Sequence, residues 1–251
     1  MRIAEIFRSW QGEGVFTGTP SVFVRASGCN LRCWFCDTPY TSWNPEGDDL
    51  AVDDILRQVD RLASDLHFSA AGVPDELAVN GNSIAPCRHV VLTGGEPMLY
   101  SELVPLAAGL RARDMHITVE TAGTLFLPLE CDLMSISPKM AGSGPRPDQD
   151  QRWTLRHERT RFAPDVIRQL AREYTYQVKF VIDSPADCDE VETWLGEFPE
   201  IDRSRVLLMP QGTDAASLAE RSMWLAPYCE KQRLTFCPRR HIEWFGFTRG
   251  T

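Results

Sequence analysis

The sequence predicts an α/β protein built on an open, partial barrel of the TIM type with about six parallel strands. Apolar runs typical of strands alternate with helical patterns over much of the 251-residue chain, and such alternation favours parallel strands joined by right-handed crossovers. Polar residues and glycines follow several of these runs, as expected where the carboxyl ends of barrel strands form an active site. Six strands are too few for a closed eight-stranded barrel, so an open one is expected.

The individual elements follow from local patterns along the chain. Ile3 to Phe7 is expected to form a short strand or edge segment, and Ser21 to Arg25 a buried strand. Val52 to Leu66 is expected to be a helix, because its apolar residues recur at helical spacing and Asp53 and Asp54 occupy its first turn. The six barrel strands, with their polar ends, are expected within residues 89–97, 116–123, 132–139, 176–183, 205–212 and 234–237. Helices are expected at residues 101–113, 164–173, 186–197 and 214–230.

Two segments interrupt this alternation and are predicted to be loops or insertions. Residues 67–88 show no clear period and are rich in glycine, proline and asparagine. Residues 140–160 begin with a glycine- and proline-rich stretch, for which a lid and plain disorder are equally compatible interpretations. No repeat or linker divides the chain, so residues 1–251 are expected to form a single domain. The aromatic-rich C-terminal stretch is expected to pack against its body.

Composition excludes several classes of function. The net charge of −9 argues against a nucleic-acid or anionic-membrane surface, and no apolar run reaches the roughly 18 residues of a membrane span. The opening residues are too polar for a signal peptide. Five scattered cysteines fit reduced thiols in a packed core better than disulfides. A cytoplasmic protein is therefore expected.

One short loop concentrates the candidate chemistry, with Cys29, Cys33 and Cys36 at spacings of four and then three residues. Thiolates favour soft metals, so the triplet indicates an iron–sulfur or a zinc site. Each iron of a four-iron cluster needs a ligand, and three cysteines leave one iron open to a substrate or cofactor. A zinc site would need His67 or Cys87 as fourth ligand, without the paired spacing typical of such sites. The open cluster is therefore favoured.

The C-x-x-x-C-x-x-C spacing, with the aromatic Phe35 before the last cysteine, resembles the radical S-adenosylmethionine (SAM) enzymes. In that family the open iron binds the amino and carboxylate groups of SAM, whose cleavage yields a 5′-deoxyadenosyl radical. The Gly-Gly-Glu-Pro run at residues 94–97 is similar to the family's element that binds the SAM amine. Each motif supports the other.

Three further features allow two interpretations each. The loop holding Gln11 and Glu13 is either a simple turn or a source of amide and carboxylate groups for a pterin or guanine ring. Arg25 lies in an apolar run and needs an anionic partner, which is either a structural carboxylate or that of a substrate. Thr38 either makes a hydroxyl-to-backbone turn contact or supplies a hard oxygen to Mg²⁺.

The whole chain resembles the 7-carboxy-7-deazaguanine synthase family. The matching pieces are Gln11-Gly12-Glu13-Gly14, Phe23-Val24-Arg25, Cys36-Asp37-Thr38, Thr93-Gly94-Gly95-Glu96-Pro97, Glu120-Thr121-Ala122-Gly123, Ser137-Pro138-Lys139 and Arg249-Gly250-Thr251. That family rearranges 6-carboxy-5,6,7,8-tetrahydropterin to 7-carboxy-7-deazaguanine with loss of ammonia, on the route to queuosine and other 7-deazapurines.

This resemblance implies a set of ligands for named residues. A [4Fe–4S] cluster would be held by Cys29, Cys33 and Cys36, and Mg²⁺ by Thr38. SAM would contact Phe35, Gly95, Ser137, Lys139 and Gln211. The pterin substrate would contact Trp10, Gln11, Gly12, Glu13, Arg25, Thr93, His241 and the terminal carboxylate of Thr251. Glu120 stands at a matching position and is a candidate catalytic residue with no assigned role.

The family also implies a homodimer and a reductant such as flavodoxin or ferredoxin. Two other functions share some of these features. A radical activase, which generates a glycyl radical on a partner protein, has the same cysteine spacing but no need for Gln11, Glu13 and Arg25 around a small ligand. A non-catalytic zinc module would use the cysteines alone.

Overall fold

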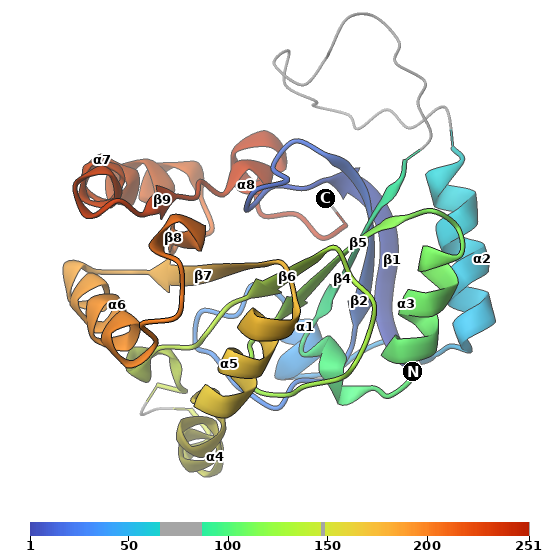
Figure 1. Ribbon diagram of the computed structural model, residues 1–251, viewed down its shortest axis with the longest axis horizontal. Coiled ribbons are helices and arrows are strands. Elements are labelled where there is room, and N and C mark those ends of the chain that lie inside the picture. The colour runs from blue at the N-terminus through green and yellow to red at the C-terminus, as the bar shows by residue number, and fades with distance from the viewer. Residues whose placement is uncertain (66–86, 147–148, 251) are drawn as a thin grey trace, which may run out of the picture.

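The computed structural model describes residues 1–65, 87–146 and 149–250, whose strands join in one nine-stranded sheet (Figure 1). The strands are β1 (Arg2–Trp10), β2 (Pro20–Ala26), β3 (Asp48–Asp49), β4 (His89–Gly94), β5 (His116–Thr121), β6 (Leu133–Ile136), β7 (Tyr176–Ile182), β8 (Val206–Pro210) and β9 (Thr235–Phe236). The α-helices are α1 (Pro39–Ser42), α2 (Val52–Ala63), α3 (Leu103–Arg111), α4 (Gln151–Arg161), α5 (Pro164–Glu173), α6 (Pro185–Glu197), α7 (Ala215–Gln232) and α8 (Arg240–Phe245). Short 3₁₀ turns cover Pro97–Leu99, Ala141–Ser143 and Arg203–Arg205.

The sheet confirms the predicted open, largely parallel architecture. Its strand order is β3-β1-β2-β4-β5-β6-β7-β8-β9, so β3 and β9 are free edges and the sheet does not close. The six predicted barrel strands are β4 to β9, and β2 joins them as a seventh parallel strand beside β4. β1 pairs antiparallel with β2, with Phe7 opposite Phe23, and β3 pairs antiparallel with β1.

Alternation along the strands gives the sheet two different faces. On β2, Val22 and Val24 belong to the main hydrophobic core, whereas Phe23 and Arg25 line a cavity on the other face. The same division recurs with Met134 and Ile136 against Ser135 on β6, and with Val178 and Phe180 against Lys179 on β7. The apolar positions therefore hold the helices in place, and the positions between them furnish the cavity.

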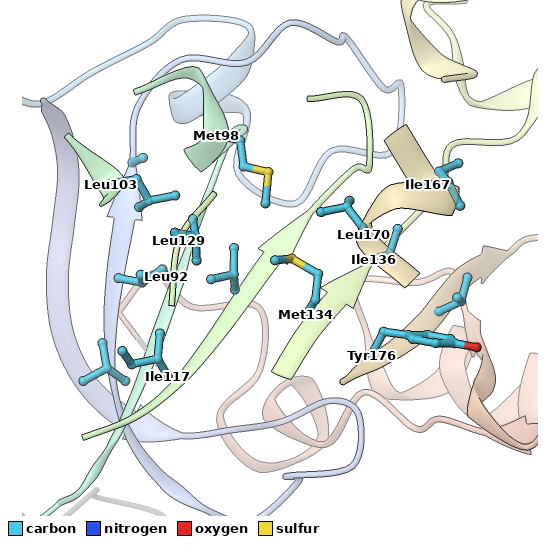
Figure 2. Packing of buried hydrophobic residues seen from close by; sticks show 14 of the residues in the cluster. Leu92, Met98, Leu103, Ile117, Leu129, Met134, Ile136, Ile167, Leu170 and Tyr176 are labelled. Carbon is cyan, nitrogen blue, oxygen red and sulfur yellow. The ribbon is translucent and has the colours of Figure 1, made fainter. Parts of the chain in front are cut away.

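The core lies between the sheet and the helices on its outer side, where α2 and α3 pack side by side (Figure 1). Figure 2 shows Leu92, Ile117 and Met134 from neighbouring strands together with Leu103 of α3 and Ile167 of α5. All five side chains are essentially inaccessible to solvent. Full burial of such a side chain stabilises the fold by about 1.5–3 kcal/mol, so this layer holds the strands in register.

The helices α3, α5, α6 and α7 confirm the predicted helices, with ends within two residues of those expected. β1 is longer than the predicted segment from Ile3 to Phe7, because its pairing with β2 extends to Trp10 opposite Pro20. α2 ends at Ala63. Leu66 and most of the predicted loop at residues 67–88 lie outside the described residues.

The prediction of a loop at residues 140–160 is wrong for the second half of this segment, which forms α4. The Asp150 carboxylate caps this helix by accepting a hydrogen bond from the Arg152 backbone N–H at 3.0 Å. His157 is fully buried, but Leu155 is exposed and most other positions are polar. Without an apolar stripe the helical period leaves no trace in the sequence.

The C-terminal segment packs against the body as predicted. Beyond α8, the Arg249 guanidinium lies 4.0 Å from the Tyr40 ring centroid and donates to the Glu5 carboxylate at 3.1 Å. Within the described part of the chain, every helix is too short or too polar to cross a bilayer.

Candidate active site

The polar face of the sheet opens into a cavity of about 500 Å³. Of the residues that the sequence singled out, the cavity is lined by Trp10, Gln11, Gly12, Glu13, Arg25, Cys29, Cys33, Phe35, Cys36, Thr38, Thr93, Gly95, Glu120, Ser137, Lys139 and His241. Gln211 is not among the lining residues and follows β8, where its backbone N–H donates to the Ile182 carbonyl at 2.8 Å. Thr251 lies outside the described residues. Positions from most of the chain thus converge on one space.

The cysteine loop follows β2 and places all three sulfur-bearing residues at the cavity. The Trp43 indole N–H donates to the Cys33 carbonyl at 3.1 Å, and the Arg32 guanidinium donates to the Cys29 carbonyl at 2.8 Å. Burial raises the pKa of the Cys29 and Cys33 thiols to about 12. These sulfurs therefore stay protonated unless a bound metal centre stabilises the thiolates.

The three cysteines supply the donor set of an iron–sulfur cluster. Among the described residues, no three His, Cys, Asp or Glu side chains come close enough together to hold one metal ion. A zinc site needs such convergence, whereas a [4Fe–4S] cluster assigns each cysteine to a different iron. The loop therefore brings three thiol donors to the cavity, one for each of three irons of such a cluster.

The backbone of Gly94 and Gly95 packs closely against the backbone at the start of the cysteine loop. Gly95 donates its backbone N–H to the Ala26 carbonyl at 3.0 Å, and Glu96 donates its own to the Gly28 carbonyl at 2.9 Å. A Cβ atom on Gly95 would lie 2.1 Å from the Gly28 carbonyl oxygen and 2.9 Å from Cys29 Cβ. The backbone approach requires glycine at this position.

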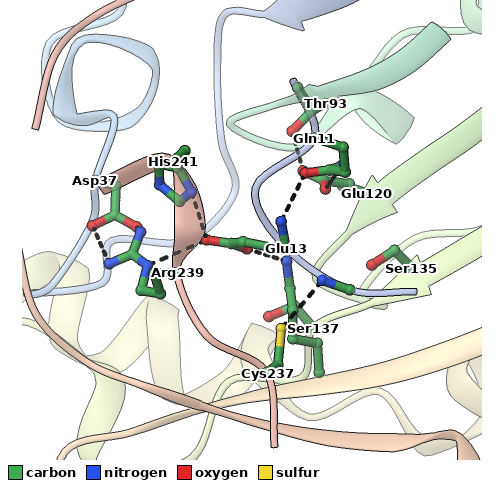
Figure 3. Close-up of polar contacts among 12 residues, drawn as sticks. Gln11, Glu13, Asp37, Thr93, Glu120, Ser135, Ser137, Cys237, Arg239 and His241 are labelled. Atoms are coloured by element: carbon green, nitrogen blue, oxygen red, sulfur yellow. Dashed lines mark hydrogen bonds and ion pairs between the residues drawn. The ribbon is translucent and has the colours of Figure 1, made fainter. Parts of the chain in front are cut away.

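Gln11, Thr93 and Glu120 form a hydrogen-bonded group on the cavity floor (Figure 3). Thr93 Oγ1 donates to Glu120 Oε2 at 2.8 Å, and Gln11 Nε2 donates to Glu120 Oε1 at 3.3 Å. Gln11 Oε1 accepts the Glu13 backbone N–H at 3.1 Å. Three segments far apart in sequence are thereby held at one place, where their amide, hydroxyl and carboxylate groups line the cavity.

Glu13 lies at the centre of a second, more highly charged group (Figure 3). Its carboxylate pairs with Lys179 of β7, accepts from Arg239 Nε at 3.2 Å and lies 3.8 Å from His241 Nδ1. Burial alone would raise the pKa of Glu13, but the charges of Lys179 and Arg239 outweigh it and hold that pKa well below its usual range. Burial lowers the pKa of His241. Glu13 is thus a largely shielded carboxylate, with 14% of its side chain exposed, that stays ionised.

The two interpretations of Arg25 are both compatible with its position. Its Nε donates to Glu5 Oε1 at 2.6 Å, which is the structural ion pair, and its side chain lines the cavity as well. Among the described residues, the hydrogen bonds of Arg25 use only Nε. Its two Nη atoms face no partner there and are available to a ligand carboxylate.

Thr38 likewise combines a turn contact with a place at the cavity. Its carbonyl accepts from the Thr41 hydroxyl and backbone N–H, each at 2.8 Å, which supports the turn that begins α1. Its own hydroxyl oxygen accepts from Thr41 Oγ1 at 3.1 Å. The neighbouring Asp37 carboxylate is engaged by Arg239. Thr38 thus brings a hydroxyl oxygen to the cavity.

Sequence reasoning missed Lys179 and Arg239. Lys179 could have been found, since a lysine inside the apolar run of a buried strand needs an anionic partner, as Arg25 does. Arg239 follows a proline in a stretch with no strand or helix pattern, and no local signal marks it as buried.

Residues 23–140 match the Radical SAM superfamily, and this stretch contains the cysteine loop and the glycine pair. The fold and the three-cysteine site therefore define a radical SAM enzyme, whose cofactors are a [4Fe–4S] cluster and SAM. The 7-carboxy-7-deazaguanine synthase of Rhodopirellula baltica is 41% identical over 250 residues, covering 99% of this chain and 88% of that relative. The enzyme of the same name from Halobacterium salinarum is 40% identical over 249 residues, covering 96% and 88%. The chain belongs to the 7-carboxy-7-deazaguanine synthase family.

Solved structures share the fold. QueE from Escherichia coli aligns over 96% of this chain and 94% of its own, with a TM-score of 0.64 and 20% identity. SuiB from Streptococcus suis, solved with S-adenosylmethionine bound, aligns over 84% of this chain and 48% of its own, with a TM-score of 0.51 and 18% identity. At these identities the likeness concerns the fold alone.

Proposed function

We propose that this enzyme rearranges 6-carboxy-5,6,7,8-tetrahydropterin to 7-carboxy-7-deazaguanine with loss of ammonia. The observation that carries the proposal is the ionised Glu13 carboxylate beside Gln11 and Glu120, in the same cavity as the three cysteines. An aminopyrimidine ring presents adjacent N–H donors and a carbonyl acceptor, and this group of carboxylates and amide offers the complementary atoms. The names of the relatives specify 7-carboxy-7-deazaguanine as the product.

The two ends of the substrate would meet different residues. Glu13, Gln11, Thr93 and Glu120 bind the ring, because acceptors that are already charged and oriented lose little freedom when a ligand docks. The Nη atoms of Arg25 bind the substrate carboxylate in the fork geometry that arginine favours. Trp10, Gly12 and His241 line the same cavity and would border the ring.

Mg²⁺ would be held by Thr38 together with oxygens of the substrate. Magnesium often keeps few protein ligands and binds through its substrate, so the Thr38 hydroxyl at the cavity would suffice as a ligand from the protein. In the rearrangement, such an ion orients the substrate and stabilises developing negative charge.

The cysteine loop and the glycine pair would hold the cofactors. When bound, the cluster and SAM supply the 5′-deoxyadenosyl radical that removes a hydrogen atom from the substrate. Phe35, Gly95, Ser137 and Lys139 line the cavity and would contact SAM there, and Gln211 would reach SAM from the loop after β8. Because substrate and product differ by ammonia alone, the conversion is redox-neutral, which allows SAM to be regenerated.

The electron that starts the reaction would come from an acidic protein such as flavodoxin or ferredoxin. The α4 arginine patch (Arg146 just before α4, and Arg152, Arg156 and Arg159 within it) is exposed, on a chain of net charge −9. The Arg146 guanidinium lies 4.2 Å from the ring centroid of Trp34, which belongs to that loop. A basic patch at the cluster steers an acidic donor to it.

Charge reversal tests this docking surface. With Arg156→Glu and Arg159→Glu combined, we expect a higher KM for flavodoxin and unchanged turnover with dithionite, which needs no docking. Arg172→Glu on α5, an exposed arginine with 75% of its side chain accessible, is the control. Equal effects with both reductants would remove the patch from this role. The homodimer and the cytoplasmic location expected from the family remain proposals, of which size-exclusion chromatography with light scattering tests the first.

The reaction itself is tested by anaerobic incubation of reconstituted protein with reductant, SAM and the carboxypterin. We expect formation of 7-carboxy-7-deazaguanine and release of ammonia, and loss of both the cluster absorbance and turnover in Cys33→Ala. Cleavage of SAM with no deazaguanine product would overturn the proposed function.

A further inference from the structure

Arg239 is a buried cation that joins three loops of the site. Only 3% of its side chain is exposed. Its Nε donates to Glu13 Oε1 at 3.2 Å, and its Nη1 donates to the Gly212 carbonyl at 2.7 Å. Both Nη atoms face the Asp37 carboxylate, with Nη2 donating to Oδ2 at 2.5 Å (Figure 3). Arg239 therefore contacts the loop after β1, the end of the cysteine loop and the loop after β8.

We propose that Arg239 is a positioning residue that fixes Glu13 against the substrate ring and ties the substrate loop to the end of the cysteine loop. The inference rests on the proposed function, since it assigns Arg239 its role through Glu13. Arg239 would act in substrate binding rather than in holding the cluster, because none of its contacts reaches a cysteine.

The geometry requires arginine rather than any cation. A guanidinium donates in three directions within one plane, and here those directions meet Glu13, Asp37 and a backbone carbonyl. A lysine ammonium has the charge but lacks the fork, so it can reach some of these acceptors and not all. The bidentate contact with Asp37 fixes the plane, and the plane directs Nε at Glu13.

The charges around Glu13 make its ionisation depend on Arg239. The groups that face it are Lys179 from β7, Arg239 and His241 from the C-terminal segment, and Cys237, whose Sγ accepts the Gly14 backbone N–H. His241 and Cys237 are neutral near pH 7, because burial lowers the pKa of His241 and raises that of Cys237 to about 11. Among the described residues, the cations that pair with Glu13 are therefore Lys179, which is also influenced by the Glu120 charge, and Arg239, which is shared with Asp37. Removal of Arg239 leaves Lys179 alone.

The neighbouring Arg240 provides a matched control. It has the same side chain one position along, but 43% of that side chain is exposed and it pairs with Glu243 within α8. It does not line the cavity. Substitutions at positions 239 and 240 therefore remove the same charge from the same segment, and only one of them disturbs Glu13.

The test compares Arg239→Gln, Arg239→Lys and Arg240→Gln in reconstituted enzyme with carboxypterin as substrate. We expect Arg239→Gln to raise KM for the carboxypterin about 10- to 100-fold, the range for a lost hydrogen bond to a charged group. The acid limb of the pH profile of kcat/KM should move to higher pH, because Glu13 protonates more readily without Arg239. Arg239→Lys should have the pH profile of the parent enzyme, but its KM should lie between those of the parent and of Arg239→Gln. Iron content and cluster absorbance should match the parent enzyme in all three.

Several results would overturn the inference. The first is that Arg239→Gln and Arg240→Gln have the same KM and the same acid limb of the pH profile. The second is that turnover in Arg239→Gln falls in proportion to its loss of iron, because Arg239 would then support the cysteine loop instead. If Arg239→Gln does not fold, Asp37→Asn replaces it, because weaker fixation of the guanidinium should raise KM in the same direction. Unmodified enzyme that yields no product would refute the proposed function itself, whereas normal product with an unchanged KM in the variants would refute the positioning role alone.

Discussion

His157 of α4 contacts the cysteine loop, and its replacement by leucine is expected to destabilise the protein by about 2–4 kcal/mol. His157 Nδ1 accepts the Arg32 backbone N–H at 3.1 Å, and Nε2 lies 2.9 Å from Ser143 Oγ, whose own hydrogen goes to the Met140 carbonyl. The ring is therefore neutral, with its proton on Nε2. Burial is the main reason that the pKa of His157 is lowered to about 4.

The magnitude follows from the groups that leucine leaves behind. The buried Arg32 N–H would lose its partner, at a cost of about 1–3 kcal/mol, and the bond to Ser143 contributes about 1 kcal/mol more. In a chain of this size the loss corresponds to a fall in Tm of about 5–15 °C. Because Arg32 lies between Cys29 and Cys33, we also expect faster loss of iron to a chelator.

Urea unfolding and chelator kinetics measure the two effects, and His157→Gln is the matched variant. A glutamine amide can both accept from Arg32 and donate to Ser143, so it should recover part of the stability and of the iron retention. A His157→Leu protein within about 0.5 kcal/mol of the parent, the range of neutral surface changes, with the same rate of iron loss would refute the reasoning.

Three other expectations concern the site and the pH range of the fold. Thr38→Ala should keep the cluster absorbance but weaken the response of turnover to Mg²⁺, and an unaltered Mg²⁺ titration would remove Thr38 from the metal site. Gly95→Ala should prevent normal cluster incorporation, measured as iron per chain, because its Cβ would lie 2.1 Å from the Gly28 carbonyl oxygen; full iron content would contradict this. Burial lowers the pKa of His89 from 6.5 to about 4, so the unfolded chain binds its proton first. The free energy of unfolding should therefore fall by up to about 3 kcal/mol as pH drops from 6.5 to 4. If the free energy of unfolding falls less in the parent protein than in His89→Gln over this range, the expectation is wrong.

The fold was predictable where burial leaves a periodic pattern. The strands β4 to β8 are short apolar runs, several of them followed by helical patterns, and they lie in the sheet in sequence order, as consecutive strands commonly do. α4 was not predicted, because the buried side chain that anchors it, among the described residues, is that of His157 alone. A single buried position produces no periodic pattern in the sequence. The length of β1 was set by its partner β2, a non-local pairing that no local window contains.

The sequence by itself determined the chemistry of this protein, because ligand chemistry is a property of side-chain type and spacing. Three thiols in one loop and a glycine pair after a strand indicate a cluster and its cofactor before any fold is known. Only the tertiary structure decided how the charges around that chemistry are balanced. Glu13, Lys179, Asp37 and Arg239 are distant in the chain and become neighbours where four segments meet at the open face of the sheet. The pKa of a buried carboxylate depends on such neighbours, and their identity is fixed by packing rather than by local sequence.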